Sequence, residues 1–138
     1  MPNPRRTRLV TAAAALASVA GALLIAGRLG RRLEIEGESM LPTLAPGDRV
    51  LVLSIGAPRP GDLVALRDPR RRDRIIVKRV EAIDADRYRV VGDNRAASTD
   101  SRTFGSVPRS EILGRVAYRY APAARAGRVT TRHTDVPG

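Results

Sequence analysis

One stretch of 19 residues without a charge, from Leu9 to Gly27, limits most strongly what this chain can fold into. An α-helix needs roughly 20 apolar residues to cross a bilayer, so this stretch is long enough for one crossing. Three arginines lie on each side of it: Arg5, Arg6 and Arg8 before, and Arg28, Arg31 and Arg32 after. This balance leaves the membrane orientation open under the positive-inside rule. We expect a basic N-terminus over residues 1–8, a transmembrane anchor over 9–27 and a basic linker over 28–32.

A cleaved secretory signal is the alternative reading of the same stretch. It would have the same basic start, the same apolar run and a small-residue cleavage site such as Ala15-Leu16-Ala17. The apolar run continues well past that site and ends at further arginines. This favours a retained anchor.

The residues after the anchor follow a period of two. Short β-branched runs, separated by Pro, Gly and Asp, lie at 48–53, 62–67, 74–83, 88–91 and 114–120. So many strands in so short a span predict a mainly β domain over 33–120, built as a compact barrel or sandwich. We expect the arginines at 70–72 to form a solvated loop and residues 108–113 to contain one helical turn. Residues 121–138 show no periodicity and are predicted to be a disordered tail.

The net charge of +11 suggests nucleic acid binding, but the distribution of the charge argues against it. Residues 1–32 hold six arginines and no acid, and residues 121–138 hold three arginines and one acid, so the flanks carry most of the excess. With three Tyr and one Phe, the chain has little aromatic surface on which bases could stack. A basic segment beside an apolar stretch fits anionic lipid better, so we expect a membrane partner and no nucleic acid.

Side-chain chemistry narrows the reaction classes further. The chain has no cysteine and a single histidine, His133, which excludes thiolate chemistry and argues against a histidine-based triad or metal cluster. Of the 25 basic residues only Lys78 is a lysine, and an arginine cannot act as a base. Alternation places Lys78 on one strand face with Ile76 and Val80, where burial would lower the pKa of its ammonium. A lysine that is neutral near pH 7–8 can take a proton from a hydroxyl, although most strand lysines only extend to water.

Two polar segments supply partners for such a lysine. Gly37-Glu38-Ser39-Met40-Leu41-Pro42-Thr43 follows a short strand, and its Gly and Pro would present Ser39 on a turn with nearby backbone N–H groups. Residues 92–102 (GDNRAASTDSR) form a dense polar loop whose hydroxyls and carboxylates could orient an amine. Each segment alone also fits an ordinary turn held by local hydrogen bonds.

Together these segments resemble the type I signal peptidases, which are Ser-Lys proteases. The segments GESMLPTLAPGDRVLV, RPGDLVAL, IIVKRV and GDNRAASTDSR are similar to four family boxes, in the family's order, over about residues 33–120. The resemblance implies that Ser39 is the nucleophile and Lys78 the general base. It also implies supporting positions, which are Ser98 for orienting the lysine, Gly37 and Met40 beside the nucleophile, and Asp93, Asn94, Asp100 and Arg102 in the last box.

The resemblance further implies a membrane-bound endopeptidase that needs no metal and no cofactor. Its catalytic domain would lie outside the cytoplasm and would cut precursor proteins after small residues of the Ala-x-Ala type, removing signal peptides or propeptides. Gly37 departs from those relatives in which a serine at this position supplies an oxyanion donor. Between Lys78 and Gly92 there is also no room for the second β-domain of larger relatives.

Three alternatives stay open. The motif AAS-x-DSR-x-FG-x-VP is similar to that of a sub-branch that matures nickel-type superoxide dismutase. Membership of that sub-branch would make this a protease with a single substrate protein. Self-cleaving repressor domains share the Ser-Lys dyad, but they carry a DNA-binding domain where this chain has an apolar stretch. A catalytically silent, membrane-tethered binding module is the third alternative. Cleavage of the chain's own Ala-rich segment is a side hypothesis, and the oligomeric state is not predicted.

Overall fold

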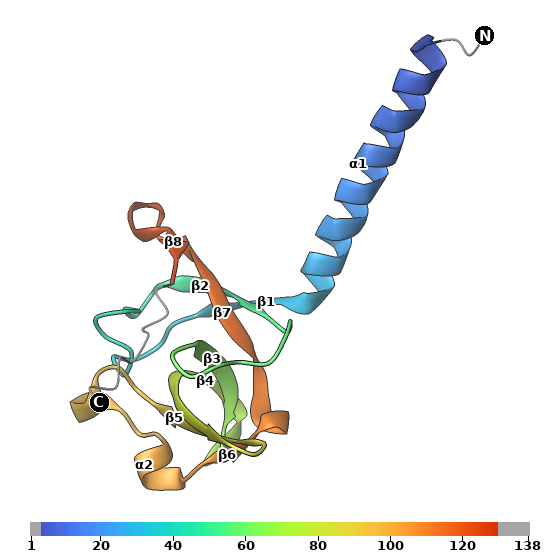
Figure 1. Cartoon of the computed structure of the whole chain (residues 1–138). Helices are drawn as coiled ribbons and strands as arrows, with labels where there is room; N and C mark the ends of the chain where they lie inside the picture. Colours follow the sequence, from blue (N-terminus) through green and yellow to red (C-terminus); the bar gives the residue numbers. More distant parts are fainter. Residues whose placement is uncertain (1–3, 130–138) are drawn as a thin grey trace, which may run out of the picture.

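The computed structural model describes residues 4–129, without the side chains of residues 4–7 and 25–29. A long helix, α1 (Pro4–Leu29), precedes a β domain and projects away from it (Figure 1). Its described apolar side chains, among them Leu9, Leu16 and Leu24, are exposed. Within the described residues, no helix combines the length and the hydropathy that a membrane span requires.

The β domain is one antiparallel sheet of eight strands, in the order β1-β2-β7-β3-β4-β5-β6 with β8 beside β7. The strands are β1 (Gly30–Glu34), β2 (Arg49–Leu53), β3 (Leu63–Asp68), β4 (Arg71–Asp84), β5 (Arg87–Val91), β6 (Val107–Pro108), β7 (Ile112–Ala121) and β8 (Gly127–Arg128). The short helices are η1 (Arg95–Ala97), α2 (Ser101–Phe104), η2 (Arg109–Glu111) and η3 (Ala123–Arg125). The sheet curves strongly, with β1, β2 and β7 in its upper part and β3 to β6 below (Figure 1). The mainly β fold class is therefore confirmed.

Strand β3 lies where two hydrophobic cores meet. Leu63 and Ala65 pack into one core with Met40, while Val64 and Leu66 pack into the other. Because successive side chains of a strand point to opposite faces, β3 is covered on both faces, and this explains its unbroken apolar run.

Strand β4 changes partners along its 14 residues. Residues 71–79 pair with β3, and residues 79–84 pair with β5. Within the described chain, residues 71–78 of β4 have no strand on the side away from β3. Likewise, β1 has no strand on the side away from β2. These two unpaired edges border the groove described below.

Two local predictions differ from the structure. Arg71 and Arg72 are exposed but begin β4, because a tight turn after Asp68 already reverses the chain at Pro69-Arg70. Residues 121–129 are not disordered, since η3 and β8 fold back and β8 pairs with Tyr118 and Arg119 of β7. Arg125 of this segment reaches the buried carboxylate of Asp48 at 3.1 Å. The rest of the predicted tail, residues 130–138, lies outside the described residues.

Candidate active site

Ser39 lies on a turn that leaves the sheet after β1. Gly37 opens the turn with φ +76°, a left-handed conformation that residues other than glycine rarely adopt. Met40 and Leu44 are buried in the core below, which holds the turn down and leaves the Ser39 side chain half-exposed. The GESM segment therefore inserts its methionine into the protein and presents its serine at the surface.

The loop after β5 binds the serine turn through its backbone. The N–H of Asn94 donates to the Ser39 carbonyl oxygen at 2.9 Å, and Asn94 Nδ2 donates to the Glu38 carbonyl at 3.1 Å. Gly92 lies where this loop touches the serine turn. A Cβ atom there would lie 2.6 Å from the Ser39 carbonyl oxygen and 2.2 Å from Ser98 Oγ. Only glycine lets these two segments approach so closely.

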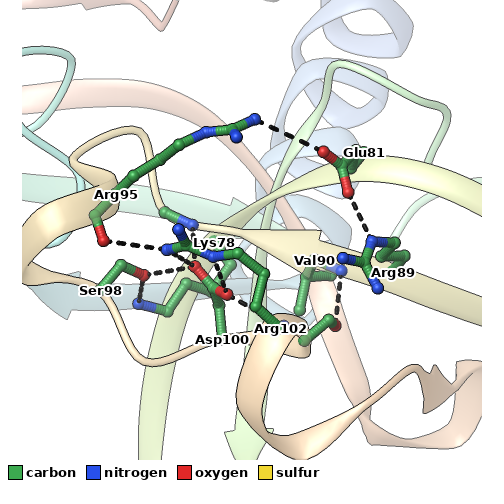
Figure 2. A network of polar contacts seen from close by, with 10 residues as sticks. Lys78, Glu81, Arg89, Val90, Arg95, Ser98, Asp100 and Arg102 are labelled. Carbon is green, nitrogen blue, oxygen red and sulfur yellow. Dashed lines mark hydrogen bonds and ion pairs between the residues drawn. The ribbon is translucent and has the colours of Figure 1, made fainter.

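Lys78 projects from β4 into the protein and is 3% exposed. It shares a strand face with Ile76 and Val80, both buried, as its position in the alternation predicts. Its ammonium donates a hydrogen bond to Ser98 Oγ at 2.9 Å (Figure 2). Burial lowers the pKa of Lys78 to about 8, opposed by the Asp100 carboxylate and assisted by the charges of Arg70 and Arg74.

The Ser98 hydroxyl is oriented by Asp100. It donates to Asp100 Oδ2 at 2.8 Å, so its oxygen lone pair is presented to Lys78 (Figure 2). Asp100 also accepts the Gly92 N–H at 2.9 Å and two bonds from the Arg102 guanidinium, each 2.9 Å long. Burial alone would raise the pKa of Asp100, but the bonds from Arg102, Gly92 and Ser98 hold it well below its usual range. This carboxylate is therefore ionised and acts only as a hydrogen-bond acceptor.

A second buried ion pair braces the other side of the loop. Arg79 donates to both carboxylate oxygens of Asp93 at 2.7 Å and to the Gly61 carbonyl at 2.7 Å. The Thr43 hydroxyl, from the serine turn, also donates to Asp93. The side chains of Arg79 and Asp93 are only 9% and 5% exposed, so this pair is worth more than a surface salt bridge in fixing geometry.

Ser39 and Lys78 line the same groove, whose volume is about 500 Å³. One wall comes from residues 33–40, and the other comes from residues 70 and 73–78, at the unpaired edge of β4. Ala97 and Thr99, which flank Ser98, complete it. Among the described residues, no group of His, Cys, Asp or Glu is placed to hold a metal ion. The groove thus offers a hydroxyl, an amine of lowered pKa and backbone N–H groups.

The same regions carry the similarity to known proteins. The family model "Signal peptidase, peptidase S26" matches residues 6–87 and 81–121. The chain belongs to the S26 signal peptidase family. The predicted family is therefore confirmed, and this S26 family member is similar to proteins of both bacteria and mitochondria.

Three relatives illustrate that range. Mitochondrial ATP-independent inner membrane protease subunit 1a of Arabidopsis thaliana is 35% identical, over 64% of this chain and 68% of that protein. Signal peptidase I of Leptolyngbya laminosa is 30% identical, over 67% of this chain and 70% of that protein. Mitochondrial inner membrane protease subunit 2 of Schizosaccharomyces pombe is 32% identical, over 69% of this chain and 67% of that protein.

Most of the predicted site residues of this S26 family member gather around the groove. Ser39, Lys78 and Gly37 line it, and Met40 lines it from the core. Behind Lys78 lie Ser98, Asp100 and Arg102 in one network, while Asp93 and Asn94 hold the serine turn. Sequence reasoning did not select Arg79, Thr43 or Gly92 as site residues. Arg79 follows Lys78 directly in a run, residues 75–80, that is otherwise apolar, and that second charge was the available signal.

Proposed function

We propose that this S26 family member is a serine endopeptidase in which Ser39 is the nucleophile and Lys78 is the general base. One observation carries the proposal. The only lysine of the chain is buried, its ammonium is bonded to Ser98, and it lines the same groove as Ser39. A lysine with a pKa of about 8 is partly neutral at physiological pH and can accept a proton.

The first half of the reaction forms an acyl-enzyme. Lys78 takes the hydroxyl proton as Ser39 Oγ attacks the carbonyl carbon of the scissile peptide. The tetrahedral intermediate then collapses, the C–N bond breaks, and Lys78 returns the proton to the leaving amine. Ser98 accepts an N–H from Lys78, which directs the nitrogen lone pair away from Ser98 and leaves it available to Ser39.

In the second half, water hydrolyses the ester. Lys78 removes a proton from the water, whose oxygen attacks the ester carbonyl. The Ser39–acyl bond breaks, Ser39 regains its proton and the new carboxyl terminus leaves. The backbone N–H of Ser39 makes no hydrogen bond with any described residue, so it is free to donate to the oxyanion. Gly37 offers no hydroxyl, so any second donor comes from elsewhere.

The groove suits a peptide in extended conformation. Its walls end in two unpaired strand edges, so a substrate strand can bond to both through its backbone. Met40 and Ile76 line the groove and give it an apolar surface, which we expect to accept small apolar side chains. With relatives named signal peptidase I, this favours precursor proteins cut after an Ala-x-Ala type sequence.

The proposed location is the membrane surface. Residues 9–27 would serve as the anchor, since they are uncharged and their described apolar side chains are exposed. The catalytic domain would lie outside the cytoplasm, where signal sequences emerge. Sedimentation of the full chain with membranes after an alkaline wash tests the anchor, and release into the supernatant would contradict it.

Mass spectrometry of cleavage products tests the activity. The full chain and its Ser39→Ala variant, in detergent, are each given a generic Ala-x-Ala precursor and a precursor of nickel-type superoxide dismutase. Cleavage of the generic precursor by the unmodified chain alone supports the proposed function. Cleavage of the dismutase precursor alone would indicate a dedicated maturation protease, and cleavage of neither would indicate a silent binding module.

A further inference from the structure

Arg74 lines the groove, close enough to Asp68 for the two charges to interact. Its side chain is exposed and makes no hydrogen bond or ion pair with any described residue. Its neighbours in the sequence differ in this respect. Arg70 bonds to Asp68, Arg71 to Asp73, and Arg72 to Glu111. A guanidinium left without a partner inside a binding groove is available to a ligand.

The position of Arg74 relative to the dyad follows from the geometry of β4. Residues 75–79 of β4 pair regularly with β3, and the register shifts between Ile75 and Arg71, so Arg74 lies at the start of the irregular part of the strand. Arg74 is four residues before Lys78, so at roughly 3.3 Å per residue it lies at most about 13 Å from Lys78 along the strand. An extended peptide in the groove covers that distance with about four residues.

Both walls of the groove lead toward the dyad. The segment from Glu34 to Glu38 leads to Ser39, and residues 74–77 lead to Lys78, so both edges run toward the dyad. A peptide bonded along these edges therefore has its scissile bond at one end of the groove and Arg74 near the other. This step rests on the proposed peptidase function.

The opposite wall carries the opposite charge. Glu36 and Glu38 line the groove, are exposed, and make no side-chain bond with any described residue. On the β4 side Asp73 is paired with Arg71, which leaves Arg74 to attract an anionic side chain, while the two glutamates repel it on the other side. The groove therefore distinguishes peptides by where a charge lies, and not by their net charge.

We infer that a substrate peptide runs in the same direction as both walls and that Arg74 determines specificity, selecting an acidic side chain about four residues before the scissile bond. This adds a charged position to the small-residue requirement near the dyad. Because the pair is partly exposed, its effect is that of a surface ion pair, about fivefold in kcat/KM at low ionic strength.

The test uses quenched peptides with alanine at the first and third residues before the cut. Glu, Gln or Lys is placed in turn at the second, fourth and fifth residues before the cut. We expect the full chain to prefer Glu over Lys at the fourth residue, and Arg74→Glu to invert that preference. The ratio of two kcat/KM values is the readout, because any change in the Lys78 base affects both peptides equally.

Arg67→Glu is the matched control, since Arg67 is an exposed arginine of the neighbouring strand β3 that does not line the groove and whose side chain makes no hydrogen bond or ion pair with any described residue. Its Glu-to-Lys ratio should stay that of the unmodified chain. Equal cleavage of Glu and Lys peptides, or a ratio that Arg74→Glu leaves unchanged, would overturn the inference while the peptidase function stands. If no peptide is cleaved, the proposed function fails. Fluorescence anisotropy with the Ser39→Ala variant then decides the charge preference through binding alone.

Discussion

The ammonium of Lys78 donates to the hydroxyl of Ser98 at 2.9 Å, and that hydroxyl in turn donates to Asp100 at 2.8 Å. The direction of both bonds is set by chemistry, since an ionised carboxylate can only accept and an ammonium can only donate. Ser98 therefore holds the amine in place without competing for its lone pair. This arrangement links the polar loop at 92–102 to the proposed base.

Ser98→Ala should slow peptide cleavage without abolishing it. The variant keeps the base and the nucleophile but loses the group that orients the amine, so we expect kcat to fall about tenfold to a hundredfold, with little change in KM. Steady-state kinetics on the generic peptide measures this. Ser110→Ala, at an exposed serine of η2, is the matched control. Unchanged kinetics in Ser98→Ala would reduce Ser98 to a structural turn residue.

Lys78→Arg should remove activity and keep the fold. Arginine stays protonated at any useful pH, so it cannot take the Ser39 proton, and loss of a general base costs about 10²–10⁴ in rate. Circular dichroism and thermal unfolding establish that the variant is folded before kcat/KM is measured. Near-normal cleavage by the folded variant would show that another group is the base.

The pH dependence of kcat/KM should follow the titration of Lys78. Because the neutral amine is the active form, kcat/KM should rise with pH and level off above about 8, where Lys78 is deprotonated. Burial lowers this pKa most, and Arg74 lowers it further through its charge. Arg74→Gln removes that positive charge, so the pKa of Lys78 should rise and the acidic limb should move to higher pH.

Arg67→Gln serves as the control for that shift, because this variant loses the same charge at an exposed arginine of β3 that does not line the groove. Its acidic limb should stay in place. If the acidic limb of the kcat/KM profile shifts equally in both variants, the shift is due to the change in net charge and not to the position of Arg74. A limb far from pH 8 in the unmodified chain would contradict Lys78 as the titrating base.

Gly92→Ala should impair both stability and activity. The added Cβ would meet Ser98 Oγ and the Ser39 carbonyl oxygen well inside contact distance. Ser98 Cβ also lies inside contact distance, so rotation of the Ser98 hydroxyl cannot relieve the clash. The backbone of the serine turn or of the 92–102 loop must shift, so we expect cleavage to fall at least about tenfold. Thermal unfolding and kinetics measure the two effects. Gly21→Ala, on α1 with no atom near its Cβ position, is the control and should leave both unchanged.

Local patterns predicted much of the fold. Alternation located the major strands and placed Lys78 on a buried face with Ile76 and Val80, since burial in a strand follows its period of two. The serine turn was predictable because Gly37 and Pro42, on either side of Ser39, are turn-forming residues, and Gly37 indeed has a positive φ.

Contacts between distant segments were less predictable. Arg79 falls on the face opposite Lys78, and its bonds to Asp93 and Gly61 help to make a buried charge stable there. Gly92 reads as an ordinary turn glycine until Ser39 and Ser98 are placed against it. Residues 122–129 have little internal pattern, but Arg125 and the β8 pairing hold them to the domain.

The most direct measurement of the central claim is covalent trapping of the acyl-enzyme. An acylating serine-reactive probe is added to the full chain, to Ser39→Ala and to Lys78→Arg, and the adduct is located by peptide mass spectrometry. We predict a single adduct on Ser39 in the unmodified chain, none in Ser39→Ala, and greatly slowed labelling in Lys78→Arg. An adduct on another residue, or labelling of Ser39 at the same rate without Lys78, would contradict the Ser39–Lys78 dyad.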